Sequence, residues 1–285
     1  MRKFFDQFLS DLADNDGKVR LIIADVGDFP LFSRNHREKF LNVGVSESNA
    51  VGIAAGLAFE GYRVFVYGIS SFFLYRAYEQ LKYSVSYWKQ PVTFVGVGFG
   101  WKYFFIGAGH FCPDDIGLAR GLPGFRIHTP YCLDGLKKVL SNSGKEPEYL
   151  RLTANIVDAE IPFSTPNSDI VLLTYGEMVK TCQSVVWELR VDHAVSLDFI
   201  ALEDLNDETI SAVVKTLSDK RVIVIEDQYV NDGLTSILWE NGCRVMLHIG
   251  LPIHSVLVAE SRSDLVKAYG MDKDSIIRSV LERLA

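Results

Sequence analysis

Short β-rich runs alternate with helical segments along most of this 285-residue sequence. In the first half, the β-rich runs are LIIAD, RVFVYG, VTFVGVG, RIHTP and EYLRLT, at 21–25, 63–68, 92–98, 126–130 and 148–153. Segments of helical spacing or composition lie between them, at 46–60, 74–89, 114–121 and 133–142. Because parallel strands need long crossover connections, the alternation predicts an α/β fold, with a parallel sheet covered by helices.

The stretch DAEIPFSTPNSD at 158–169 interrupts this alternation. Its prolines and small polar residues are typical of a linker between domains. The alternation then resumes, with β-rich runs at 169–176, 194–201, 221–227 and 244–250. We therefore expect two open α/β domains, at 1–157 and 168–285.

Composition excludes several classes of protein. The chain is 48% hydrophobic and 23% charged, as globular proteins are, and its net charge of −7 argues against a nucleic-acid partner. No apolar run is long enough to span a membrane, and the N-terminus lacks a signal-peptide core and predicts a short amphipathic helix. Cys112, Cys132, Cys182 and Cys243 form no CxxC pair. Reduced thiols in the cytoplasm, with no metal held by this chain, are therefore expected.

In open α/β sheets, ligands bind beyond the carboxyl ends of the strands. This rule selects the segment from Asp25 to Asp28, the segment from Gly68 to Phe73, which contains Ser70, and the loop 98–113. Candidate chemistry is therefore expected at these three places.

The segment NVGVSESNAVGIAAGLAFEG at 42–61 carries a glutamate, Glu47, at the start of a helix of small residues. Small side chains let another backbone approach closely, and a carboxylate in the first turn is favoured by the helix dipole. From these residues alone, Glu47 is either a capping acid or the acid of a site.

The same segment resembles the "GIAEQN-VGIAAGLA-G" segment of transketolases and deoxyxylulose-phosphate synthases. The resemblance implies that Glu47 hydrogen-bonds the aminopyrimidine of thiamine diphosphate and activates the cofactor, which requires a buried carboxylate. ISSFFLYRAYEQLKYSVSYWKQPVTFVG at 69–96 is similar to the family's "STFLQRAYDQI", which places Phe73 on the ring that stacks against the aminopyrimidine, followed by Arg76. GAGHFCPDDIGLARGLPGFRIHTP at 107–130 resembles "GPTHQ--EDLALLRALPNM-VI-P", with His110 on the histidine that faces the substrate.

The rest of the chain also resembles this family, which implies a thiamine-diphosphate-binding pyrimidine domain at 1–157 and a transketolase C-terminal domain at 168–285. The implied catalytic residues are Glu47 and His110. The implied cofactor-binding residues are Glu47, Phe73, Arg76, Ser70 and Asp25. The implied substrate residues are His110, Arg151 and Trp101.

One half of the family's cofactor site is missing from the sequence. The family's diphosphate domain carries a GDG motif and a later asparagine, which hold Mg²⁺, and this chain has no GDG. The resemblance therefore implies that a second subunit binds the diphosphate and Mg²⁺, in a heterotetramer with two copies of each chain.

Substrate recognition departs from the family pattern. Gly98 stands where transketolases have a phosphate-binding histidine, and Ala154 stands where they have an arginine. Alternatively, an insertion shifts the alignment with the family, and other cations replace the missing phosphate ligands; Lys102 and Arg151 are the candidates. The nearby aromatic residues either pack at an interface or form a wall for a sugar; they are Phe99, Trp101, Tyr103, Phe104 and Phe105.

These observations favour a subunit of a split transketolase that transfers a two-carbon ketol unit between small sugars, with an atypical substrate. A deoxyxylulose-phosphate-synthase-like subunit and a 2-oxoacid dehydrogenase β-like subunit are the alternative enzymes. A non-catalytic partner is a further alternative, against which the presence of Glu47, Phe73 and His110 argues.

Overall fold

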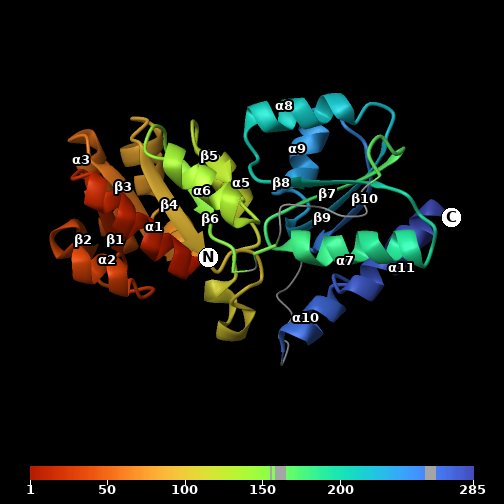
Figure 1. Ribbon diagram of the computed structural model, residues 1–285, viewed down its shortest axis with the longest axis horizontal. Helices are drawn as coiled ribbons and strands as arrows, with labels where there is room; N and C mark the ends of the chain where they lie inside the picture. Colours follow the sequence, from red (N-terminus) through yellow and green to blue (C-terminus); the bar gives the residue numbers. More distant parts are fainter. Residues whose placement is uncertain (155, 158–164, 254–260) are drawn as a thin grey trace.

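The computed structural model describes residues 1–154, 156–157, 165–253 and 261–285. Within them, two sheets lie side by side (Figure 1), and all neighbouring strands are parallel. The first sheet has the order β2 (Phe40–Asn42), β1 (Val19–Ile23), β3 (Arg63–Ile69), β4 (Val92–Val97), β6 (Glu148–Arg151), β5 (Arg126–His128). The second has the order β10 (Val245–Leu251), β9 (Arg221–Tyr229), β7 (Ile170–Tyr175), β8 (Asp198–Leu202). The predicted architecture of two parallel-sheet α/β domains is confirmed.

Helices cover both sheets (Figure 1). Those of the first domain are α1 (Arg2–Asn15), α2 (Pro30–Asn35), α3 (Glu47–Phe59), α4 (Tyr78–Gln80), α5 (Asp115–Arg120) and α6 (Leu133–Asn142). Those of the second are α7 (Met178–Val191), α8 (Asp207–Thr216), α9 (Leu234–Glu240), α10 (Arg262–Ala268) and α11 (Lys273–Leu284). The amphipathic N-terminal helix is confirmed as α1, which buries Phe5, Leu9 and Ala13 at a spacing of four residues.

Three local features were not expected from the sequence. Strand β2 and helix α2 are too short to give a periodic signal. The helix expected at 74–89 is divided into a π-helical turn at Phe72–Arg76, the short α4, and a second π-helical turn at Leu81–Ser86. Wide turns of this kind often occur at functional sites, because they change which side chains share a face.

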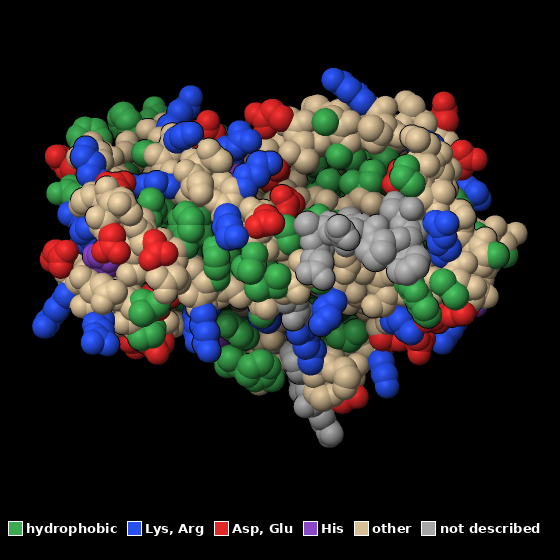
Figure 2. All heavy atoms as spheres, viewed as in Figure 1, with side chains coloured by type: hydrophobic (Ala, Val, Ile, Leu, Met, Phe, Trp, Pro, Cys, Tyr) green, Lys and Arg blue, Asp and Glu red, His purple; other side chains and the backbone are tan. Residues whose placement is uncertain are grey.

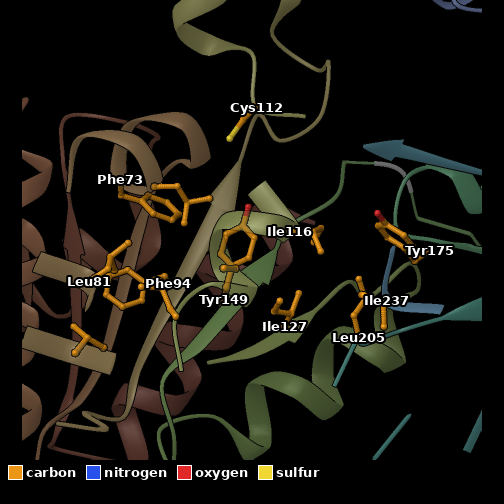
Figure 3. Close-up of a cluster of buried hydrophobic side chains, with 14 of the residues drawn as sticks. Phe73, Leu81, Phe94, Cys112, Ile116, Ile127, Tyr149, Tyr175, Leu205 and Ile237 are labelled. Atoms are coloured by element: carbon orange, nitrogen blue, oxygen red, sulfur yellow. The ribbon is translucent and has the colours of Figure 1, made fainter. Parts of the chain in front are cut away.

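The two domains share a hydrogen-bonded seam and a core. The backbone N–H of Thr129 donates to Glu203 at 2.7 Å, and that of Leu205 donates to Ile127 at 3.0 Å, so the edge strand β5 is paired with the chain that follows β8. One hydrophobic cluster contains Tyr149 from the first domain and Tyr175 from the second (Figure 3). The domain limits 1–157 and 168–285 stay a prediction, since part of the predicted linker lies outside the described residues.

The face of the molecule drawn in Figure 2 carries both positive and negative side chains. Figure 2 shows Lys and Arg side chains interspersed with Asp and Glu over both domains. Among the described residues, no helix combines the length and the apolar character needed to cross a membrane.

Candidate cofactor site

Glu47 opens α3 beyond the short strand β2, at the carboxyl side of the first sheet. The residue is only 6% exposed. Its Oε1 has no hydrogen-bond partner among the described residues. A buried carboxylate oxygen without a donor is costly, and the helix dipole offsets only part of that cost. The position therefore suits an acid that receives a hydrogen bond from a ligand.

Arg76 lies next to this acid, and Phe72 lies next to Arg76. Arg76 Nη1 is 3.6 Å from Glu47 Oε1, and the Arg76 guanidinium carbon lies 4.0 Å from the centroid of the Phe72 ring. Both side chains come from the π-helical turn, in which they share one face. Ser48 at the start of α3 donates its hydroxyl to the carbonyl of Arg76 at 3.2 Å. The turn and the helix thus hold an acid, a cation and an aromatic ring together.

His110 joins this group from the loop 98–113. Its ring centroid is 4.8 Å from that of Phe72, with an angle of 59° between the planes. The hydroxyl of Ser71 donates to the carbonyl of Gly109 at 3.0 Å. The base of the loop is closed by Gly100 and Cys112, whose backbones pair in both directions at 2.8 and 3.0 Å. The structure therefore brings together Glu47, Phe72, Arg76 and His110, and we call them the site cluster.

Phe73 lies on the other side of the π-helical turn from this cluster. Its ring is 2% exposed and packs on Phe94 and Tyr149, with centroids 5.9 and 6.0 Å away, inside the core shown in Figure 3. The half-buried Phe72 is the ring beside Arg76 and His110. Sequence reasoning missed Phe72, because adjacent phenylalanines cannot be told apart until the turn geometry is known. Stacking by Phe73 stays a prediction, and its burial disfavours it.

The other two predicted cofactor-binding residues lie in different surroundings. Ser70 is fully buried and its hydroxyl lies within hydrogen-bond distance of the Tyr149 hydroxyl, at 2.8 Å, so its side chain faces the core. Asp25 is exposed at the carboxyl end of β1, with a φ of 54°. Its N–H donates to Asn42 Oδ1 at 3.1 Å, and its carboxylate accepts from Asn42 Nδ2 at 3.4 Å. These hydrogen bonds do not reach Glu47, so the roles of Ser70 and Asp25 stay predictions.

The surroundings of Arg151 disfavour the predicted contact with substrate, which stays a prediction. Arg151 is 1% exposed, and its guanidinium lies 3.0 Å from Asp115 and 3.0 Å from Asp227. Phe99 covers its face, with the guanidinium carbon 4.1 Å from the ring centroid. A cation paired with two carboxylates and closed off from solvent cannot reach a substrate without breaking both pairs. Arg151 is therefore part of the buried framework between the domains.

Trp101 also lies in enclosed surroundings. It is 3% exposed and stacks on Tyr269 of the second domain, with centroids 6.3 Å apart and planes 23° apart. This packing favours the interface role over the sugar wall, and a substrate contact by Trp101 stays a prediction. Gly98 has a φ of +72°, and a Cβ there would meet the Tyr103 ring at 2.3 Å. The Tyr103 ring therefore fills the space that a side chain at position 98 would need.

Lys102 is also paired, with Glu177 of the second domain at 2.5 Å. The same carboxylate oxygen accepts from Thr153 and from the N–H of Ala154, each at 3.0 Å. Burial would raise the pKa of Glu177, but Lys102 and these donors outweigh it and lower the pKa to about 2. Of the two cations expected to replace the missing phosphate ligands, Arg151 is enclosed and Lys102 is held by a buried carboxylate.

The site cluster fits one end of the cofactor. The unpartnered buried oxygen of Glu47 can share a hydrogen bond with an amino group or a ring nitrogen, and the half-buried Phe72 ring offers a surface to a flat heterocycle such as an aminopyrimidine. Among the described residues, no group of three or more His, Cys, Asp or Glu side chains is placed to hold a metal ion. The arrangement is therefore suited to the pyrimidine end of thiamine diphosphate.

Comparison with known proteins identifies the family of the chain. The model of the family "Transketolase, pyrimidine binding domain" matches residues 1–156. Over 99% of its length the chain is 29% identical to an apulose-4-phosphate transketolase subunit of Phocaeicola vulgatus, covering 96% of that protein. Over its full length it is 28% identical to "Putative transketolase C-terminal section" of Methanocaldococcus jannaschii, again covering 96%. It is 26% identical to "1-deoxy-D-xylulose-5-phosphate synthase" of Clostridium acetobutylicum over 84% of this chain and 41% of that one.

Solved structures show the same fold. "Split gene transketolase, inactive beta4 tetramer" matches with a TM-score of 0.80 at 20% identity, over 99% of this chain and 97% of that chain. Transketolase from Campylobacter jejuni matches with a TM-score of 0.79 at 17% identity, over 99% of this chain and 46% of that one. The fold, the matched domain and the full-length relatives agree, and this chain belongs to the transketolase family, in which it corresponds to the pyrimidine-binding and C-terminal half.

Proposed function

We propose that this chain is one subunit of a split, thiamine-diphosphate-dependent transketolase that moves a two-carbon ketol unit between sugars. The single observation that carries the proposal is the buried Oε1 of Glu47, which has no hydrogen-bond partner among the described residues and lies 3.6 Å from Arg76. The guanidinium of Arg76 in turn covers the Phe72 ring. When bound, thiamine diphosphate supplies the carbon nucleophile that carries the transferred unit. Glu47 receives the hydrogen bond from its aminopyrimidine, Phe72 or Phe73 lies against that ring, and His110 faces the substrate.

The partner completes the site in this proposal. The chain lacks a GDG motif, so the diphosphate and Mg²⁺ are assigned to a second subunit that carries it. One full-length relative is named as a transketolase subunit and another as a C-terminal section, which supports a two-chain enzyme. For this enzyme we propose two copies of each chain. The four cysteines are free, which fits a reducing cytoplasm.

The substrates are proposed to be small sugars outside the usual transketolase pair. Gly98, Ala154 and the enclosed Arg151 support this, because each removes a cation that could bind a sugar phosphate. The relative named for apulose 4-phosphate supplies a phosphorylated sugar to compare with unphosphorylated ones. The deoxyxylulose-phosphate synthases among the relatives support a second candidate, in which pyruvate is the donor.

Co-purification and turnover test this function together. The chain is expressed with a partner that contains GDG followed by an asparagine about 25 residues later, and the complex is assayed for ketol transfer with Mg²⁺ and thiamine diphosphate. We expect a stable complex that transfers two-carbon units. Carbon dioxide release from pyruvate would favour the second candidate, and a complex that is inactive with every donor would refute the proposal.

A further inference from the structure

A buried polar chain of five residues runs from the second domain to Ser70, two residues before Phe72 of the site cluster. Asp227 on β9 lies 3.0 Å from Arg151, and Arg151 lies 3.0 Å from Asp115 at the start of α5. The hydroxyl of Tyr149 is 2.6 Å from Asp115 and 2.8 Å from Ser70. Each of these five residues is at most 2% exposed. We call this set the buried relay.

Two members of the relay adjoin the site cluster. Ser70 lies just before the segment that holds Phe72 and Arg76. Asp115 follows the loop that carries His110, and that side of the loop is held by the second domain, because the N–H of Tyr229 donates to the carbonyl of Pro113 at 3.0 Å. Gln228 of the second domain also donates to Asp115 Oδ1, at 2.7 Å. The second domain is thus bonded to the segment that ends the His110 loop.

Two glycines show how closely the relay is packed. A Cβ at Gly96 on β4 would meet Ser70 Oγ at 2.4 Å and the Tyr149 ring at 2.6 Å. A Cβ at Gly100 would meet the Asp227 carboxylate at 2.6 Å. Close packing leaves few alternative rotamers for the relay side chains, so a displacement at one end is passed to the next residue.

We infer that Tyr149 is a positioning residue, through which the second domain fixes the π-helical turn and the His110 loop of the site cluster. Within the relay, the Tyr149 hydroxyl joins Ser70 to the carboxylates at the domain boundary. Without it, Ser70 Oγ and Asp115 Oδ2 lose a partner in a dry core, and both segments can open locally. The kinetic part of this inference rests on the proposed function, whereas the structural part does not.

Hydrogen exchange on the full chain tests the link with matched variants. Tyr149→Phe removes the hydroxyl and keeps the ring. Tyr175→Phe is the control, since Tyr175 is equally buried but gives its hydroxyl to Glu226 within the second domain, at 2.9 Å. We expect amide exchange in 69–77 and 109–117 to rise about tenfold in Tyr149→Phe and to stay at the wild-type rate in Tyr175→Phe.

The second-domain end of the relay, at Asp227, is tested by substitutions at two adjacent residues of β9. Asp227→Asn removes the carboxylate that faces Arg151, and Glu226→Gln alters an equally buried acid that instead accepts from the backbone of Leu234 and Thr235. Exchange in 69–77 is expected to rise in Asp227→Asn and not in Glu226→Gln. Equal exchange in Tyr149→Phe and Tyr175→Phe, or no response to Asp227→Asn, would overturn the inference.

Turnover of the two-subunit complex gives the kinetic part. In Tyr149→Phe, kcat is expected to fall about tenfold while the substrate KM stays within about twofold, because misplaced groups slow the reaction and leave ground-state binding intact. If the wild-type complex transfers no ketol unit, the proposed function fails, and the exchange measurements still decide whether the relay acts. An unchanged kcat in an active complex would overturn the positioning role of Tyr149.

Discussion

The guanidinium of Arg76 lies 3.6 Å from Oε1 of Glu47, and the two side chains differ sharply in exposure, at 52% and 7%. A half-exposed cation therefore borders a buried carboxylate oxygen that has no hydrogen-bond donor among the described residues. At 3.6 Å the guanidinium is too far away to donate a hydrogen bond, so Oε1 stays available to a ligand.

Glu47→Gln is expected to preserve the fold and to slow hydrogen–deuterium exchange at cofactor C2 by about 10²-fold or more in the two-subunit enzyme. The reason is that an amide cannot take part in the proton sharing that a carboxylate offers to a ring nitrogen. Nuclear magnetic resonance of quenched samples measures the rate. Glu60→Gln, at the exposed C-terminal end of α3, is the control and should leave it unchanged. Unaltered exchange in Glu47→Gln would show that Glu47 is not the acid that activates the cofactor.

The chain by itself is expected to bind thiamine diphosphate weakly, with Kd well above 1 µM, in the presence of Mg²⁺. Half of a composite site lacks the metal bridge and the preassembled pocket that reduce the entropic cost of binding. Titration calorimetry of the purified chain, then of the complex, measures both affinities. A submicromolar Kd for the chain alone would contradict the split site.

Phe72→Ala and Phe73→Ala are expected to affect different properties, cofactor binding in the first and stability in the second. Phe72→Ala should weaken cofactor binding by the complex about three- to tenfold and change stability little, because its ring lies beside the site cluster. Phe73→Ala should cost about 3–5 kcal/mol of unfolding free energy, because its ring is buried in the core. Denaturant titration and cofactor titration separate the two. A stable Phe73→Ala variant that loses cofactor affinity would return the stacking role to Phe73.

Xylulose 5-phosphate and ribose 5-phosphate are expected to be poor substrates of the complex. Each missing charge-assisted bond to phosphate accounts for about 1.5–3 kcal/mol, so two of them lower kcat/KM by two or more orders of magnitude. The measurement is kcat/KM over a panel that includes apulose 4-phosphate, unphosphorylated sugars and nucleotide-linked sugars. The prediction is wrong if the two pentose phosphates outperform the rest at low concentration.

Glu148→Gln is expected to stabilise the chain at alkaline pH. Burial raises the pKa of Glu148 from 4.5 to about 7, and the hydroxyl of Thr93, 2.8 Å away, opposes the shift only in part. Since the folded-state pKa lies above the unfolded one, this group favours folding below pH 4.5 and loses that contribution as pH rises through about 7. Glutamine accepts the Thr93 hydrogen bond without ionising. The unfolding free energy of the variant, relative to that of the wild type, should therefore rise by about 1–3 kcal/mol between pH 5 and pH 8.5.

Denaturant unfolding at both pH values tests this gain. Glu146→Gln is the control, since that side chain is 55% exposed. Burial lowers the pKa of the neighbouring His128 to about 4, so its titration adds the opposite slope, in wild type and variant alike. A difference between Glu148→Gln and wild type that does not change with pH would contradict the prediction.

The sequence by itself determined the architecture and the identity of the candidate acid. Runs such as VTFVGVG and RVIVIED are buried parallel strands because continuous apolar residues suit a sheet covered on both faces. Glu47 could be singled out because its helix of small residues resembles a family segment in which a glutamate stands at the same place. These signals are local, and short-range side-chain preferences are enough to produce them.

Only the tertiary structure decided which way individual side chains face. The π-helical turn directs Phe72 to the site cluster and Phe73 into the core. The second domain supplies Asp227, which together with Asp115 holds Arg151 away from the surface, and Tyr269, which stacks on Trp101. Residues 76 and 168 positions apart in the chain meet in these contacts, which no local pattern encodes. Burial of a charge or a ring depends on partners that only folding brings near, and for this reason the roles of Arg151 and Trp101 could not be read from sequence.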